Sequence, residues 1–100
     1  MYRFTRTATA RNAAVVPAGI QFATEVTAYL NKKYDLKLRF GIELFGGSTI
    51  HWQFETDSLD KITALNAKLL QDPEYIAILQ KEKEVWADGS LRDCIVFFPG

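Results

Sequence analysis

Apolar and polar residues alternate along the stretch from Leu38 to Glu55, in two runs that are joined at a glycine pair. Alternation with a period of two is typical of a half-buried β-strand. The apolar positions of both runs would share one face, made of Leu38, Phe40, Ile42, Leu44, Ile50, Trp52 and Phe54. The pattern therefore predicts a β-hairpin with one apolar and one polar face.

The loop of this hairpin can be inferred from which side chains share a face. A two-residue turn at Gly46-Gly47 would place Glu43 on the apolar face, because a slip of one residue moves every side chain to the other side. A three-residue loop over 46–48 keeps one face apolar and the other polar. On the polar face it places these residues opposite each other across the two strands: Glu43 and His51, Gly41 and Gln53, and Arg39 and Glu55. Registers shifted by two residues would preserve the faces as well, so the exact pairs stay open.

The segments before and after the hairpin predict further elements. Residues 2–9 alternate loosely and are rich in threonine and aromatic side chains, which favours a first strand. Its faces would carry Tyr2 and Phe4 on one side and Arg3, Thr5 and Thr7 on the other. Pro17 suits the first turn of a helix, where its missing N–H costs nothing. Apolar residues then recur at helical spacing as far as Asp35, as an inward stripe of Ile20, Ala23, Val26, Thr27, Leu30 and Tyr34.

A second helical region follows the hairpin. Asp57 or Ser58 is expected to cap its start. The segment Asp72-Pro73-Glu74 should interrupt it and restart a helix, because proline breaks a helix interior but is favoured at the first position. The restarted piece would direct Tyr75, Ile76, Leu79 and Trp86 inward.

The stretch 91–98 is apolar on both faces and predicts the last strand. One face would carry Cys94, Val96 and Phe98, and the other Ile95 and Phe97. A cysteine on such a row is expected to be a buried, unreactive thiol.

Composition limits the class of protein. One hundred residues, 48% of them hydrophobic, fit a single domain over 1–100 with an ample core. Twelve basic and twelve acidic residues give zero formal net charge, which argues against a nucleic-acid-binding surface. A single cysteine cannot form an intrachain disulfide, and a reducing compartment follows. Without a signal segment or a long apolar run, we expect a soluble cytoplasmic protein that does not bind membranes.

The order strand, helix, strand, strand, helix, strand predicts the α+β class and a ferredoxin-like βαββαβ fold. Both helical regions would cover one face of a four-stranded antiparallel sheet. The open face would hold Thr5, Thr7, Arg39, Glu43, His51, Gln53 and Glu55, with one apolar row from the last strand. A solvated face is one interpretation. An apolar edge strand, however, is seldom left uncovered, and closed two-fold dimers are the commonest homo-oligomers, so we expect a homodimer.

The order of elements, the chain length and the segment Trp52-Gln53-Phe54-Glu55 before a capped helix resemble the dimeric α+β barrel superfamily. Asp72-Pro73-Glu74-Tyr75 is similar to the pattern in its NIPSNAP-type and antibiotic-biosynthesis-monooxygenase-type members. The resemblance implies two sheets packed with their open faces together around a cavity. It also implies relatives as diverse as cofactor-independent monooxygenases, haem-degrading enzymes and polyketide cyclases, so it indicates fold and dimer better than reaction.

His51 is the only histidine and the sole side chain whose ordinary pKa lies near neutrality. Paired with Glu43 it is the candidate for a general base in a dimer cavity, while a purely structural cross-strand pair is the alternative interpretation. The ligand-binding residues expected beside it are Arg39, Gln53, Thr5 and Thr7, although Arg39 with Glu55 also fits a structural pair. With one histidine and one cysteine, no metal site of recognised spacing is present. No cofactor is expected. The haem-ligating histidine of the haem-degrading relatives comes from a helix and His51 is on a predicted strand, so that role does not carry over to His51, and whether haem binds stays open.

Two functions remain open at this point. The first is a monooxygenase-like or cyclase-like enzyme that acts on a small aromatic or polyketide-like molecule in the barrel cavity. The second is a non-catalytic dimer that binds a small apolar or aromatic ligand, or another protein. Neither the reaction nor the ligand follows from the sequence.

Overall fold

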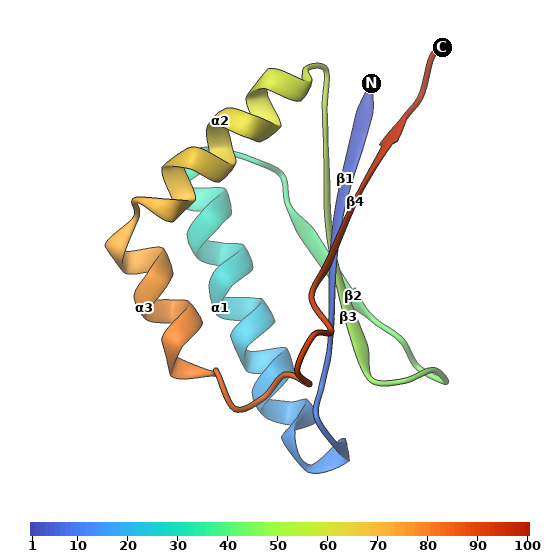
Figure 1. Ribbon diagram of the computed structural model, residues 1–100, viewed down its shortest axis with the longest axis vertical. Helices are drawn as coiled ribbons and strands as arrows, with labels where there is room; N and C mark the ends of the chain where they lie inside the picture. Colours follow the sequence, from blue (N-terminus) through green and yellow to red (C-terminus); the bar gives the residue numbers. More distant parts are fainter.

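The computed structural model describes residues 1–100 and contains a single four-stranded antiparallel sheet packed against one layer of helices (Figure 1). The elements in chain order are β1 (Tyr2–Thr9), the short 3-10 helix η1 (Ala13–Val15), α1 (Val16–Tyr34), β2 (Arg39–Ile42), β3 (Thr49–Thr56), α2 (Leu59–Leu70), α3 (Pro73–Lys81) and β4 (Arg92–Phe97). The strands lie in the order β2-β3-β1-β4. This arrangement confirms the predicted ferredoxin-like α+β fold. None of the helices is long and apolar enough to cross a membrane.

Local signals in the sequence place the helix ends. Ser58 caps α2 by accepting a hydrogen bond from the Asp60 backbone N–H, and Asp72 caps α3 by accepting from the backbone N–H groups of Glu74 and Tyr75. Each cap satisfies donors that the first turn of a helix leaves free. The interruption expected at Pro73 therefore separates α2 from α3.

The buried face of α1 is rotated from the predicted stripe. Phe22 and Ala23 are 6% and 0% exposed, whereas Ile20 is 39% exposed. The face that packs on the sheet is centred on Gly19, Ala23 and Val26, and at 3.6 residues per turn Ile20 lies about 100° around the helix from Gly19. The prediction that Ile20 points inward was wrong, because small residues allow the helix to approach the sheet along a different line.

The hairpin keeps its predicted faces but has a different register. Arg39 pairs with Gln53 and Gly41 with His51, a shift of two residues from the predicted pairs Arg39–Glu55 and Gly41–Gln53. Strand β2 ends at Ile42, so Leu44 and Phe45 lie in a longer loop and are 83% and 101% exposed. The prediction that Leu44 belongs to the apolar core face was wrong, as was the three-residue loop.

The Glu43 carboxylate contacts the backbone of the longer loop. It accepts a hydrogen bond from the backbone N–H of Gly47 at 3.3 Å, and the Glu43 backbone N–H donates to the Thr49 carbonyl at 3.0 Å. Ser48 adopts a positive φ of 62° to close the turn. Alternation placed Glu43 on the strand, but Glu43 lies after the end of β2 and its side chain contacts the loop.

Strand β4 is exposed along its whole length, because it forms an edge of the sheet. Cys94 pairs with Thr5 and lies on the face that no helix covers, so the prediction of a buried thiol was wrong. Trp86 also departs from expectation, because α3 ends at Lys81 and Trp86 instead forms an isolated bridge with Ala10. Its ring still packs inward, against Phe22 and Trp52.

Candidate functional site

The predicted site residues lie together on the open face, in two rows that run across the sheet. The first row joins Arg39, Gln53, Thr5 and Cys94 as successive Cα partners on β2, β3, β1 and β4. The second row joins Gly41, His51, Thr7 and Arg92 in the same way. The structure thus assembles residues from all four strands into one polar patch. Their roles as ligand-binding groups stay a prediction.

Glu43 and His51 are in contact even though the register differs from the predicted one. The Oε1 atom of Glu43 lies 3.0 Å from Nε2 of His51, with both side chains 39% exposed. This hydrogen bond, followed by the one from the Gly47 backbone, holds the pKa of the Glu43 carboxyl below its ordinary value. This contact is close enough for proton transfer between Glu43 and His51. It fits equally well a structural pair that holds the loop in place.

The expected pair between Arg39 and Glu55 does not form. Glu55 instead accepts from Arg3 at 3.3 Å, because the two-residue shift moves Arg39 opposite Gln53. The Arg3 guanidinium also lies 4.9 Å from the ring centroid of Phe98. Arg39 is exposed, and its side chain makes no hydrogen bond or ion pair within the chain, so the guanidinium is available to a ligand or a partner.

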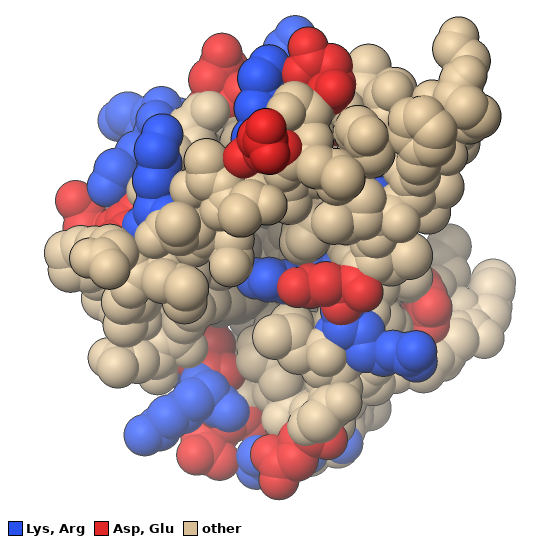
Figure 2. All heavy atoms as spheres, turned by 45° about the horizontal axis from the view of Figure 1, so that its top comes forward, with Lys and Arg blue, Asp and Glu red and all other residues tan.

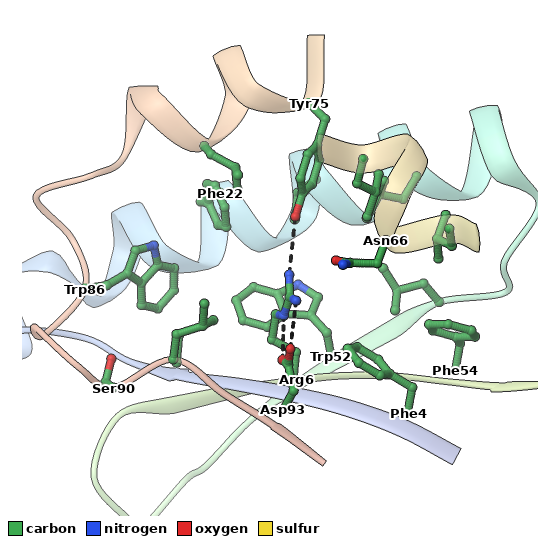
Figure 3. Close-up of a pocket in the computed structure, with 18 of the residues that line it drawn as sticks. Phe4, Arg6, Phe22, Trp52, Phe54, Asn66, Tyr75, Trp86, Ser90 and Asp93 are labelled. Carbon is green, nitrogen blue, oxygen red and sulfur yellow. Dashed lines mark hydrogen bonds and ion pairs between the residues drawn. The ribbon is translucent and has the colours of Figure 1, made fainter. Parts of the chain in front are cut away.

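A separate cavity of about 640 Å³ lies on the other side of the sheet, between the strands and the helices (Figure 3). Eighteen of its 26 lining residues are hydrophobic, and they come from both layers of the fold. Its aromatic residues are Phe4, Phe22, Trp52, Phe54, Tyr75 and Trp86. His51 does not line this cavity. The surface turned toward the viewer in Figure 2 is hollowed near its centre and carries basic and acidic groups in small mixed clusters.

Three aromatic rings form a rigid part of the wall. The ring of Phe22 meets those of Trp52 and Trp86 edge to face, with centroids 6.1 and 5.6 Å apart, and the two tryptophans lie 5.8 Å apart. Edge-to-face contacts of this kind stabilise by about 0.5–1.5 kcal/mol each beyond the area that they bury. Both tryptophans of the chain therefore report on the cavity.

A polar group crosses the cavity from the sheet to the helices. Arg6 on β1 donates from Nε and Nη2 to the two carboxylate oxygens of Asp93 on β4, at 2.7 and 2.9 Å. Its Nη1 donates to the hydroxyl of Tyr75 on α3 at 3.4 Å, as the dashed lines of Figure 3 show. The hydrogen bonds to Asp93 outweigh the effect of burial and raise the pKa of Arg6 further above its ordinary value. The guanidinium therefore stays charged inside a mainly apolar space.

Asp72 fixes the position of Tyr75 in this wall. It is 3% exposed and accepts hydrogen bonds from Tyr29 and Tyr34 at 2.7 Å and from Lys33 at 3.0 Å. Burial alone would raise the pKa of Asp72, but these hydrogen bonds outweigh burial and hold it well below its ordinary value. Because Asp72 also accepts from the Tyr75 backbone N–H, the start of α3 is tied to the end of α1.

Sequence reasoning missed the residues of this polar group. The sequence does contain a signal for this pair. Arg6 lies two residues after Phe4, and Asp93 lies two residues before Ile95, so each charge shares a strand face with an apolar residue that points toward the helices. Because a charge on a helix-facing row is normally paired with an opposite charge, Arg6 and Asp93 indicate that β1 and β4 are neighbouring strands. No group of three or more histidine, cysteine or acidic side chains is arranged to hold a metal ion.

Comparison with known proteins finds similarity in structure alone. No family model and no curated protein sequence matches this chain. Its fold is similar to that of a NIPSNAP family protein of unknown function from Agrobacterium tumefaciens, at 22% identity and a TM-score of 0.80 over 99% of this chain and 92% of the other.

Two further structures share the fold. One is a proposed antibiotic biosynthesis monooxygenase from Deinococcus radiodurans, at 13% identity and a TM-score of 0.73 over 100% of this chain and 94% of the other. The other is a dimeric protein of unknown function with a ferredoxin-like fold from Bacteroides fragilis, at 16% identity and a TM-score of 0.65 over 97% and 95%. These similarities confirm the resemblance in fold that the sequence predicted.

Proposed function

We propose that this protein binds a small aromatic or polyketide-like molecule in the cavity between its sheet and its helices. The cavity itself carries the proposal: its volume of about 640 Å³ lies within the range of small-molecule sites, and its walls are apolar and aromatic with few polar groups. The hydroxyl of Tyr75, the amide of Asn66 and the hydroxyl of Ser90 are among the uncharged polar groups that line it (Figure 3).

Binding is favoured over catalysis because of where the candidate bases lie. Asp93 is engaged by Arg6 through both oxygens, so it is a weak base for a ligand. His51 lies on the opposite face of the sheet from this cavity. The similarity to a proposed monooxygenase supports a cofactor-independent oxygenase or a cyclase as the second candidate function. In that case the pair Glu43 and His51, with Arg39, Gln53, Thr5 and Thr7, would serve a second space enclosed between two copies.

The proposed assembly is a homodimer in which each chain contributes residues 1–100 as a single α+β barrel domain. Val96 and Phe98 on the open face are 43% and 39% exposed, and a partner would cover them. A formal net charge of zero places no repulsion between two copies. The dimeric protein from Bacteroides fragilis with the same fold supports this assembly. A cytoplasmic location stays a prediction.

Calorimetric titration with 2-naphthamide, an uncharged two-ring probe, tests ligand binding. We expect saturable binding to the wild-type protein with a change in tryptophan fluorescence, since Trp52 and Trp86 both line the cavity. The substitution Asn66→Phe places a ring at the cavity and should weaken binding at least tenfold. Ala67→Phe is the matched control, because Ala67 is the next residue of α2, is exposed and does not line the cavity. Equal affinity of the two variants, or no binding by the wild-type protein, would contradict the proposal.

A further inference from the structure

The charged residues around the cavity balance one another. They are Arg6, Lys83, Asp88 and Asp93, two of each sign. Lys83 and Asp88 are exposed. Arg6 is the more enclosed, with 27% of its side chain exposed, and it meets Asp93 directly. The cavity therefore contains a charged pair but offers no net charge to a ligand.

The two side chains bind each other through two parallel hydrogen bonds, with 45% of the Asp93 side chain still exposed. Two parallel hydrogen bonds between a guanidinium and a carboxylate are among the strongest that side chains make. Both oxygens of Asp93 and two nitrogens of Arg6 are used in this way, and the third nitrogen of Arg6 contacts Tyr75. An anionic ligand that binds at Arg6 would have to displace Asp93, and a cationic ligand that binds at Asp93 would have to displace Arg6.

Displacement is costly for either kind of ligand. A charge that enters an apolar space without a counter-ion loses its hydration, and separating this partly exposed pair leaves an uncompensated charge behind. An uncharged ligand avoids both costs. It can lie beside the polar group and exchange hydrogen bonds with Tyr75 or Asn66.

The polar group also divides the space. In Figure 3 the side chains of Phe4, Phe54 and Asn66 lie on one side of the line from Tyr75 through Arg6 to Asp93. Those of Phe22, Trp86 and Ser90 lie on the other side. Ligand rings in the two parts would therefore lie on opposite sides of the Arg6–Asp93 pair.

We propose that Asp93 is a specificity-determining residue: by neutralising Arg6 it restricts the cavity to uncharged ligands. This inference rests on the proposed function, and it narrows the ligand class to uncharged aromatic molecules. Removal of the carboxylate should turn Arg6 into an anion site, and removal of the guanidinium should turn Asp93 into a cation site.

Three planar probes of the same shape test this selectivity by calorimetry: uncharged 2-naphthamide, anionic 2-naphthoate and cationic 2-naphthamidinium. The wild-type protein should bind the amide at least tenfold more tightly than either ion. Asp93→Asn should improve the affinity for naphthoate at least tenfold and change that for the amide less than threefold. Arg6→Gln should improve the affinity for naphthamidinium by a similar factor.

Glu55→Gln is the matched control, because it removes one carboxylate from an arginine pair on the opposite face of the sheet. It should leave all three affinities unchanged. The two cavity variants are independent, and circular dichroism identifies which of them is folded. Naphthoate binding as tight as amide binding in the wild-type protein overturns the inference, as does an unchanged ratio of naphthoate to amide affinity in Asp93→Asn. If the wild-type protein binds none of the three probes, the proposed function itself fails.

Discussion

Arg6 and Asp93 are Cα partners on β1 and β4, and two hydrogen bonds of 2.7 and 2.9 Å join their side chains on the helix-covered side of the sheet. They are 87 residues apart in the sequence. The pair fastens the edge strand β4 to its neighbour at a position where the helix layer leaves a cavity. Its contribution to stability and its effect on ligand choice can be measured separately.

Removal of Asp93 alone should destabilise the fold. Asp93→Ala leaves the Arg6 charge unpaired, and because both side chains are partly exposed we expect a loss of about 1–2 kcal/mol rather than the larger cost of breaking a fully buried pair. The double variant Arg6→Met with Asp93→Leu should recover most of this loss, since apolar residues of similar size can replace such a pair. Urea denaturation measures both. A double variant that is less stable than Asp93→Ala would show that the pair stabilises the fold beyond neutralising one charge.

Asp72→Asn should lower the melting temperature at neutral pH by about 5–10 °C. Asparagine still caps a helix well, so the variant keeps the cap of α3 and removes the charge that Tyr29, Tyr34 and Lys33 contact. Differential scanning calorimetry measures the shift. Asp57→Asn is the control, because Asp57 pairs with Lys61 at the surface with 72% of its side chain exposed, and its loss should change little.

The effect of Asp72 should also depend on pH in a defined direction. Its pKa in the folded protein is below the ordinary value, so its contribution is fully present above the unfolded-state pKa of about 4. As the pH falls below that value, the unfolded chain takes up a proton that the folded carboxylate does not, and the contribution declines. The difference in melting temperature between wild type and Asp72→Asn should therefore shrink from pH 6 to pH 2. A difference that grows toward low pH would contradict the low pKa.

His51→Ala should leave the melting temperature nearly unchanged, because the contact with Glu43 is partly exposed and such pairs contribute little. It should also leave the affinity for 2-naphthamide unchanged, since His51 does not line the cavity. If His51 serves a site between two copies, the substitution should also abolish turnover of the ligand that this second site accepts, with the melting temperature still nearly unchanged. A large loss of stability would support the structural interpretation of the pair.

A charge on the open face should disrupt the proposed homodimer. Val96→Asp places a carboxylate in the apolar row of β4 that a second copy would cover, and we expect sedimentation velocity to show a shift from dimer to monomer. Leu70→Asp is the control, because Leu70 is 70% exposed on α2 in the helix layer, away from the open face. A wild-type protein that is monomeric at micromolar concentration would contradict the shared barrel.

Much of the fold could be predicted because its signals are local. Period-two alternation marked β1 and β3, and the caps at Ser58 and Asp72 marked the starts of α2 and α3. Each of these features depends on residues within one turn or one strand, so neighbouring positions in the sequence contain the necessary information. The hairpin faces were correct for the same reason.

The details that failed depend on how elements meet. The register of β2 against β3 differs by two residues from the predicted one, because alternation along each strand is the same for both registers and cannot distinguish them. The Glu43 carboxylate contacts the longer loop that the observed register leaves. Ile20 pointed outward because small residues of α1 set its line of approach to the sheet. Cys94 was exposed because β4 is an edge strand with one face beyond the helix layer.

The sequence by itself determined the order of elements, the starts of α2 and α3, and the grouping of Thr5, Thr7, Arg39, His51 and Gln53 on one face. Only the tertiary structure decided that Arg6 meets Asp93 and Tyr75 within a cavity. The physical reason is distance along the chain: alternation assigns a side chain to a face, whereas contacts between residues of β1, α3 and β4 arise only when the sheet and the helix layer pack together. The cavity is what that packing leaves open.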